Sequence, residues 1–157
     1  MNLVKSFFYA LCGIGHSIRY ERNFRIHMVA MATVVIFANI YNLPLSQYPP
    51  LILCITLVMS LETVNTAIER AVDLESPNRH PLAKIAKDSA AAGVLVGAIG
   101  SVSIAVITFS DITKLLSAIE YFKTPSHLIG LIIYIVVAAV FVFVPEIIQS
   151  KDKENKI

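Results

Sequence analysis

The chain contains no tryptophan and has little charge for its 157 residues. Only 15% of its residues are charged, and the net charge of +2 gives no indication of nucleic-acid binding. The two cysteines, Cys12 and Cys54, have neither metal-ligand nor redox spacing. We therefore interpret both cysteines as small apolar residues and predict no disulfide.

Nucleotide-binding motifs of soluble enzymes are also missing. The sequence has no Walker loop, no kinase glycine-rich loop and no dinucleotide fingerprint, because Gly13-x-Gly15 is too short to count. The four histidines show no pairwise metal spacing, and no His/Arg-rich phosphatase constellation is present. These absences argue against the common soluble nucleotide-binding folds and against a lipid phosphatase.

Hydrophobic residues, in contrast, make up 56% of the chain, and the mean hydropathy is +0.70. Such a composition is typical of integral membrane proteins. Four segments are long enough to cross a bilayer, namely residues 27–43, 49–69, 89–109 and 127–144. Residues 2–20 have one apolar side and are expected to form a helix lying on the membrane. The predicted fold class is an all-α polytopic membrane helical bundle with an N-terminal interfacial helix.

Basic residues indicate the orientation of these spans. They precede the first span, separate the second from the third and follow the fourth: Lys5, Arg19, Arg22 and Arg25; Arg70, Arg79, Lys84 and Lys87; Lys151, Lys153 and Lys156. The loop at 42–50 has no charge, and acidic and basic residues balance within 111–126. By the positive-inside rule, both termini and the basic loop between the second and third spans are cytoplasmic.

A polar stripe follows one face of the second span. Glu62, Asn65, Glu69 and Asp73 stand at i, i+3, i+7 and i+11, which places them within an arc of about 80° on a helix. Ionisable groups in a membrane segment are costly and are functional-site candidates by default. One alternative is a polar seam that only joins helices. Another is an ion pathway, although a pathway should carry acids along the whole span, and residues 51–61 have none.

Depth in the membrane suggests different tasks for these carboxylates. Glu62 lies about 12 Å deeper than Arg70, and about 10 Å separate Glu62 from Glu69 along the axis, too far to hold one metal ion together. Glu62 suits a proton acceptor, whereas Glu69 at the surface suits hydrated Mg²⁺. Lys87, at the start of a helix with free N–H groups, is a candidate polyphosphate contact. Glu21 is either a second metal carboxylate or a solvated surface residue.

Three further segments carry none of the candidate chemistry. The third span contains Gly93-x-x-x-Gly97, which predicts close helix packing, either between subunits or within one subunit. Residues 111–126 are expected to form a solvated loop, and the charged tail from Lys151 is expected to be disordered.

The polar segments resemble the bacterial diacylglycerol kinase family, which includes undecaprenol kinases. The resemblance is carried by Glu62-Thr-Val-Asn-Thr-Ala-Ile-Glu-Arg-Ala-Val-Asp73 and by Ala86-Lys-Asp-Ser-Ala-Ala91. The segment Glu21-Arg-Asn-Phe-Arg-Ile-His27 is similar to the undecaprenol-kinase branch in particular. The likeness extends over residues 5–109.

This resemblance implies a small trimeric enzyme of the bacterial plasma membrane that transfers the ATP γ-phosphate to a lipid alcohol, with Mg²⁺ and with active sites shared between neighbouring subunits. It makes Glu62 the general base and Glu21 and Glu69 the metal ligands. The implied ATP-binding residues are Tyr9, Glu21, Asn65, Glu69, Asp73, Asn78, Arg79, His80, Lys87 and Asp88. The implied lipid-substrate residues are Phe24, Arg25, Glu62 and Ala91.

The fourth span departs from the family, whose common form has three. We therefore expect a lipid kinase core over residues 1–110 and an extra loop, fourth span and basic tail over 111–157. The extra helix covers the lipid entry side or alters packing around the trimer, and we expect the core to keep its activity without it. The favoured acceptor is undecaprenol, with diacylglycerol as the alternative.

Overall fold

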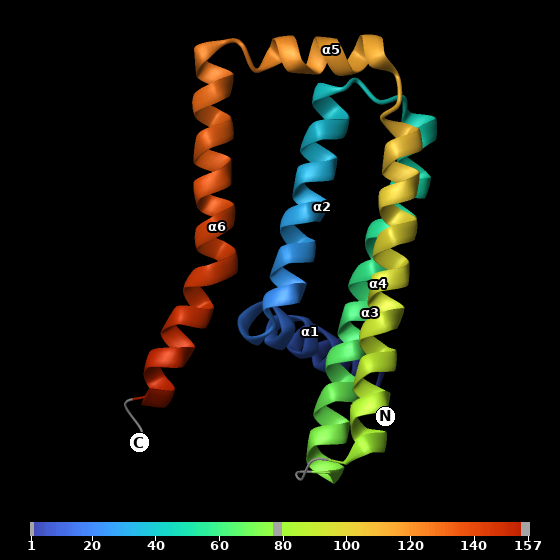
Figure 1. Cartoon of the computed structure of the whole chain (residues 1–157), viewed down its shortest axis with the longest axis vertical. Helices are drawn as coiled ribbons and strands as arrows, with labels where there is room; N and C mark the ends of the chain where they lie inside the picture. The colour runs from blue at the N-terminus through green and yellow to red at the C-terminus, as the bar shows by residue number, and fades with distance from the viewer. Residues whose placement is uncertain (1, 77–79, 155–157) are drawn as a thin grey trace.

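The computed structural model describes the backbone of residues 2–76 and 80–154, with side chains as far as residue 145. Within this part of the chain all regular structure is helical, which confirms the predicted fold class. The elements are α1 (Leu3–Tyr20), α2 (Arg22–Ile40), the short 3₁₀ helix η1 (Leu45–Gln47), α3 (Tyr48–Glu75), α4 (Pro81–Thr108), α5 (Ile112–Tyr121) and α6 (Pro125–Glu154) (Figure 1).

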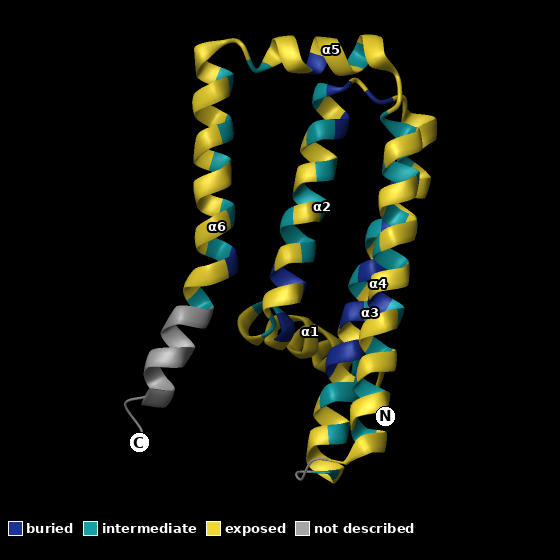
Figure 2. Cartoon of the chain, viewed as in Figure 1, coloured by how far each residue is buried: buried dark blue, intermediate teal, exposed yellow. Residues whose placement is uncertain are grey.

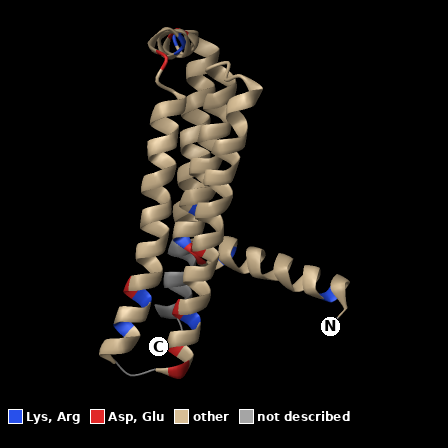
Figure 3. Ribbon diagram, turned by 90° about the vertical axis from the view of Figure 1, so that its right-hand side faces the viewer, with Lys and Arg blue, Asp and Glu red and all other residues tan. Residues whose placement is uncertain are grey.

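Four segments are long and apolar enough to cross a membrane, as the sequence predicted. They are Arg22–Ile40, Leu45–Glu75, Pro81–Thr108 and Pro125–Pro145. The protein is thus a multi-pass membrane protein. Each helix begins before the apolar stretch that predicted it, whereas α2 ends at Ile40, three residues before the predicted end of the first span. Charged side chains gather towards one end of the bundle and on α5 at the other end, which leaves a long uncharged middle (Figure 3).

Local sequence signals explain where the helices begin. Pro49 and Pro50 occupy the first turn of α3, where a missing N–H costs no hydrogen bond. Pro81 opens α4 in the same way, and the N–H of Leu82 donates to Nδ1 of His80 at 3.2 Å. At the turn after α2, Asn42 has a φ of 53°, a left-handed conformation that asparagine tolerates better than most residues.

The segment after α4 differs from prediction, because the expected solvated loop contains the ten-residue helix α5. Asp111 caps α5 by accepting hydrogen bonds from the N–H groups of Thr113 and Lys114. The N–H of Asp111 in turn donates to the hydroxyl of Tyr41 at 2.9 Å. Apolar residues recur through α5 at i, i+3, i+4 and i+7, a helical pattern that the surrounding charges obscured: Ile112, Leu115, Leu116 and Ile119.

The end of the chain also differs from the predicted disordered tail, since α6 continues as a helix to Glu154. Pro145 lies inside α6. Proline lacks the N–H that a helix needs and therefore bends it. Figure 1 shows α6 changing direction in its lower part.

The long helices pack unequally. The antiparallel pair α3 and α4 share the most extensive contact, α2 packs on α3, and α6 packs on α2 and α1. Buried residues gather where α1, α2 and α3 meet and again at the opposite end of the bundle (Figure 2). At that opposite end, Ala38, Tyr41, Leu43 and Leu51 form a cluster against which Phe109 packs.

The two glycines of the Gly93-x-x-x-Gly97 motif have different surroundings. A Cβ at Gly97 would meet Cδ1 of Leu61 at 2.8 Å, whereas a Cβ at Gly93 would find no atom within 4 Å among the described residues. Gly97 therefore allows α4 to approach α3 within one chain, and Gly93 faces outward.

Candidate functional site

The polar stripe of α3 runs from a buried end to an exposed end. Glu62 is 3% exposed and Asn65 is 6% exposed, while Glu69 is half-buried and Asp73 is exposed. The structure thus brings the four predicted residues onto one face, with Glu62 deepest. A carboxylate this deep needs polar neighbours, because a charge without a partner is costly to bury.

The neighbours of Glu62 come from the corner between α1 and α2 and from α3 itself. The side chain of Asn23 contacts the carboxylate of Glu62, and Glu21 and Glu69 lie close enough to repel it electrostatically. Glu62 therefore lies within electrostatic range of two further carboxylates, Glu69 on the same helix and Glu21 at the corner between α1 and α2. The metal-binding role that the resemblance implied for Glu21 and Glu69 stays a prediction. Sequence reasoning missed Asn23, whose only signal was its position in the 21–27 segment.

Asn65 connects the buried and exposed parts of the stripe. Its Nδ2 donates a hydrogen bond to Oε1 of Glu69 at 3.1 Å, one helical turn away. Its Oδ1 is buried and has no hydrogen-bond partner among the described residues. Buried polar atoms are nearly always paired, so an unpaired amide oxygen between two carboxylates indicates a place for a bound cation or donor group.

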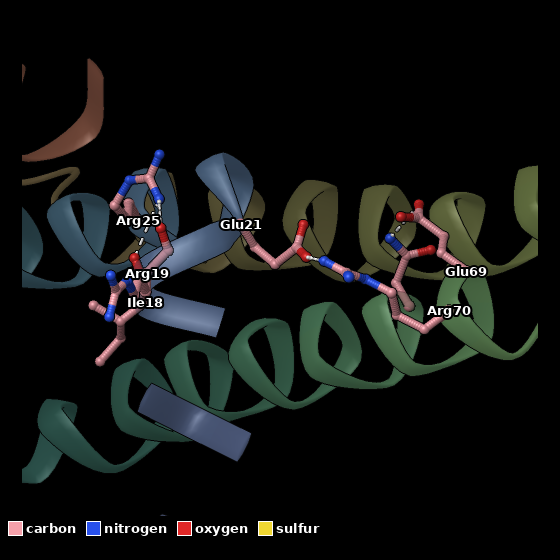
Figure 4. Close-up of polar contacts among 7 residues, drawn as sticks. Ile18, Arg19, Glu21, Arg25, Glu69 and Arg70 are labelled. Carbon is pink, nitrogen blue, oxygen red and sulfur yellow. Dashed lines mark hydrogen bonds and ion pairs between the residues drawn. The ribbon is translucent and has the colours of Figure 1, made fainter. Parts of the chain in front are cut away.

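An ion pair links α3 to the corner between α1 and α2. Nη2 of Arg70 lies 2.7 Å from Oε1 of Glu21, and Figure 4 shows the two side chains extending towards each other. Glu21 itself has an extended backbone and separates the two helices. Arg70 was not among the predicted site residues, although it directly follows Glu69.

A second ion pair joins two candidate nucleotide residues. Nζ of Lys87 lies 2.5 Å from Oδ1 of Asp73, so the end of α3 and the beginning of α4 are held together there. The expectation that Lys87 lies at a helix start with free N–H groups is wrong, because α4 already begins at Pro81. Lys87 is past the first turn and acts through its side chain, whereas His80 occupies the helix start.

The other predicted site residues are more scattered. Asp88 and Ala91 are exposed on α4, and Tyr9 is exposed on α1, which projects away from the bundle (Figure 3). Phe24 and Arg25 are buried, at 3% and 1% exposed. Asn78 and Arg79 lie outside the described residues.

An apolar cavity of about 330 Å³ lies among α2, α3 and α4. Its lining includes Val58 and Met59, about one helical turn from Glu62, and His27, one turn from Asn23. A volume near the lower end of the usual range for ligand pockets, roughly 300–1,000 Å³, makes this cavity a candidate for part of a hydrocarbon chain.

The oxygen donors present fit a Mg²⁺ ion that is bound mainly by the phosphates of a nucleotide. The described residues include no group of three or more His, Cys, Asp or Glu side chains arranged to hold a metal. Mg²⁺ bound with nucleotides commonly uses one or two carboxylates together with phosphate oxygens and water. Glu69 and the unpaired Oδ1 of Asn65 offer oxygen donors that this ion prefers. Glu21, which like Glu69 lies within electrostatic range of Glu62, would add a second carboxylate.

Comparison with known proteins assigns a family to this arrangement. The family model for prokaryotic diacylglycerol kinase matches residues 8–109. An undecaprenol kinase of Bacillus subtilis is 43% identical over 105 residues, which cover 67% of this chain and 85% of that protein. A diacylglycerol kinase of Synechocystis is 44% identical over 102 residues, 64% of this chain and 58% of that protein.

A diacylglycerol kinase of Helicobacter pylori is also similar, with 33% identity over 97 residues, which cover 62% of this chain and 76% of that protein. No solved structure gives a significant match. The region matched by the family model contains α2, α3 and α4 with the whole polar stripe, and it ends before α5 and α6. The chain therefore belongs to the prokaryotic diacylglycerol kinase family of lipid kinases.

Proposed function

We propose that this lipid kinase transfers the γ-phosphate of ATP to undecaprenol at the cytoplasmic face of a bacterial plasma membrane. The observation that carries the proposal is the buried Glu62, placed between a polar, carboxylate-rich end of the bundle and an apolar cavity. Such a boundary suits an acceptor with one hydroxyl on a long hydrocarbon chain. The identity to the Bacillus subtilis undecaprenol kinase, over 85% of its length, supports this choice of acceptor.

In the proposed reaction, Glu62 accepts the proton of the lipid hydroxyl while the hydroxyl oxygen forms a bond to the γ-phosphorus. The bond from that phosphorus to the β-γ bridging oxygen breaks, and ADP leaves. Asn23, in contact with the Glu62 carboxylate, holds it in position for the hydroxyl. A correctly placed general base contributes about 10²–10⁴-fold to such a reaction.

The nucleotide is proposed to bind along the exposed half of the stripe. Asp73 lies near the end of α3, and its ion-pair partner Lys87 lies on α4. The Lys87 ammonium would balance phosphate charge. Glu69 and Glu21 would hold Mg²⁺, which when bound neutralises charge on the polyphosphate. For Glu21 this requires release of Arg70, whose exposed guanidinium is available to pair with phosphate instead.

The wider organisation belongs to the same proposal. We infer that residues 1–110 form the kinase core, that both termini face the cytoplasm and that the chain assembles as a homotrimer. The family match over residues 8–109 supports the boundary of the core. The concentration of basic side chains at one end of the bundle supports the orientation (Figure 3).

Diacylglycerol is the second candidate acceptor, favoured by the 44% identity to the Synechocystis diacylglycerol kinase. The two lipids present a hydroxyl at the same depth but differ in the chain below it. The test is a panel of purified lipid alcohols with γ-labelled ATP and the full-length protein in mixed micelles. We expect undecaprenol to give the highest kcat/KM; a clear preference for diacylglycerol would refute the proposed acceptor.

Glu62→Gln supplies the matched catalytic control for this panel. The amide preserves the shape of the side chain and removes its basicity, so we expect turnover to fall about 10²–10⁴-fold. ATP binding, measured by equilibrium dialysis with Mg²⁺, should be retained. Near wild-type phosphorylation of both lipids by this variant would exclude Glu62 as the base.

A further inference from the structure

Arg25 is the most deeply buried large side chain in the described part of the protein, at 1% exposed. Its Nε and Nη2 both donate to the carbonyl of Val142 in α6 at 3.1 Å. Its Nη1 donates to the carbonyls of Ile18 at 3.1 Å and Arg19 at 3.2 Å in the last turn of α1 (Figure 4). The guanidinium therefore binds three backbone carbonyls from two other helices.

Both ends of this arrangement have a physical cause. The last carbonyls of α1 lack partners within their own helix and favour a cation. Val142 lies three residues before Pro145, where the helix bends and the carbonyls of the preceding turn are open to other donors. Arg25 supplies N–H donors to the carbonyls at both places. We call its contact with the carbonyl of Val142 the α6 clamp.

The clamp acts on a segment that also touches the candidate site. In this corner segment, residues 21–25, Glu21 pairs with Arg70 and Asn23 contacts Glu62 on the side of α3. On the side of α6, the guanidinium of Arg22 stands 4.8 Å from the ring centre of Phe143, close to the clamp. Figure 1 shows α2 between α6 and the α3–α4 pair.

We propose that α6 is a positioning element of the lipid-acceptor site, acting through the α6 clamp. The clamp fixes the corner segment and with it the place of Asn23 against Glu62. Arg25 is thus a positioning residue whose partner is α6, rather than a direct contact of the lipid. The inference rests on the proposed role of Glu62 and assigns a function to a helix outside the region that matches the family.

The location predicts which kinetic constant depends on the clamp. α6 packs on α1 and α2, whereas the Asp73–Lys87 pair joins α3 to α4 at the proposed nucleotide end. Loss of the clamp should therefore raise the KM for lipid and leave the KM for ATP nearly unchanged. A general loss of folding would instead lower the amount of active enzyme without this selectivity.

The test is a double-mutant cycle in the full-length protein. Arg25→Gln removes the charge from one side of the clamp, and Val142→Phe overpacks the interface and moves the carbonyl from the other. We expect each variant to raise the lipid KM roughly tenfold, as for loss of a hydrogen-bonded charge. We expect the double variant to resemble either single variant, because both disrupt one contact.

Tyr134→Phe is the matched control, since Tyr134 joins α6 to α2 away from the corner by donating to the carbonyl of Val29 at 3.1 Å. It should leave the lipid KM unchanged. Additive effects of Arg25→Gln and Val142→Phe, or an equal effect of Tyr134→Phe, would overturn the proposal. If Arg25→Gln does not accumulate in membranes, Arg25→Lys carries the same cycle.

These outcomes are separate from the proposed function. The cycle is measured with whichever lipid alcohol the wild-type protein phosphorylates best, so a different acceptor leaves the clamp testable. An active wild-type enzyme with an additive cycle refutes the clamp alone. A wild-type protein that phosphorylates no lipid alcohol refutes the proposed function and the positioning role together.

Discussion

At the scale of single residues, one helix face contains carboxylates in very different surroundings. Glu62 is buried beside Asn23, Glu69 is half-buried and accepts a hydrogen bond from Asn65, and Asp73 is exposed in an ion pair with Lys87. A deep carboxylate favours proton transfer, and a more hydrated one favours a hydrated cation. We therefore propose that carboxylates on one helix face serve different steps according to their depth.

The metal assignment predicts the behaviour of the two outer carboxylates. We expect Glu21→Gln and Glu69→Gln to raise the Mg²⁺ concentration for half-maximal activity more than they raise the lipid KM. The reason is that each removes an anionic oxygen donor from the proposed Mg²⁺ site. Mg²⁺ titrations at saturating ATP and lipid measure the effect.

Asp111→Asn is the matched control for these substitutions, because Asp111 caps α5, outside the proposed site. It should leave the Mg²⁺ titration as in the wild type. An unchanged titration for Glu21→Gln and Glu69→Gln, together with a raised lipid KM, would place these carboxylates at the lipid end instead.

At the scale of helices, the sequence predicted features with a repeating pattern along one helix. It missed the contacts between helices that are distant in the sequence. The four spans and the stripe from Glu62 to Asp73 follow from hydropathy and helical spacing alone. The contact between Arg25 and Val142 joins residues 117 positions apart, and no local pattern encodes it. The helix α5 was missed because charged residues at its ends resembled a loop.

The family resemblance supplied the residue roles that spacing could not. From the residues alone, Glu21 was either a second metal carboxylate or a solvated surface residue, and the structure places it in contact with Arg70 and near Glu62. Arg25 was assigned to the lipid region by resemblance, but it lies beneath α6, a helix that the common three-span form lacks. The assigned site roles stay predictions, and so does the activity of the core without α6, for which the α6 clamp predicts a raised lipid KM.

The Gly93-x-x-x-Gly97 motif gives a test at this scale. We expect Gly97→Val to destabilise the protein by about 1–3 kcal/mol, because the new side chain overpacks the α3–α4 contact at Leu61. Thermal unfolding of the detergent-solubilised protein, followed by circular dichroism, measures the change. Gly93→Val is the matched control, because a Cβ at Gly93 would meet no described atom of the same chain within 4 Å. This variant should unfold at much the same temperature as the wild type. Equal destabilisation by both changes would contradict the packing assigned to Gly97.

At the scale of the whole molecule, the candidate site residues of one chain do not all lie in the same place. Glu21 and Glu69 both lie within electrostatic range of Glu62 in the same chain, whereas Tyr9 is exposed on α1, which projects away from the bundle (Figure 3). A nucleotide contact from Tyr9 therefore fits a neighbouring subunit better than its own chain. In the proposed homotrimer, a closed ring, each subunit would then complete the site of the next.

This arrangement predicts that two defective chains recover activity when they assemble together. Glu62→Gln retains Tyr9, and Tyr9→Ala retains Glu62. In randomly mixed trimers, about one site in four combines the intact residue from each chain, because the two residues come from different subunits. Co-expression in one membrane, followed by an assay at subsaturating ATP, should give more activity than either variant expressed alone.

A mixture of Glu62→Gln with Glu69→Gln provides the control, because both residues lie on α3 and enter a site from the same chain. Every site in this mixture lacks one of the two carboxylates, so co-expression should bring no recovery. Recovery in the control mixture would show that α3 residues of different subunits share a site. No recovery in the mixture of Tyr9→Ala with Glu62→Gln would have one of two meanings: each subunit uses its own α1, or Tyr9 does not reach the nucleotide. Either result refutes the shared site proposed for Tyr9 and Glu62.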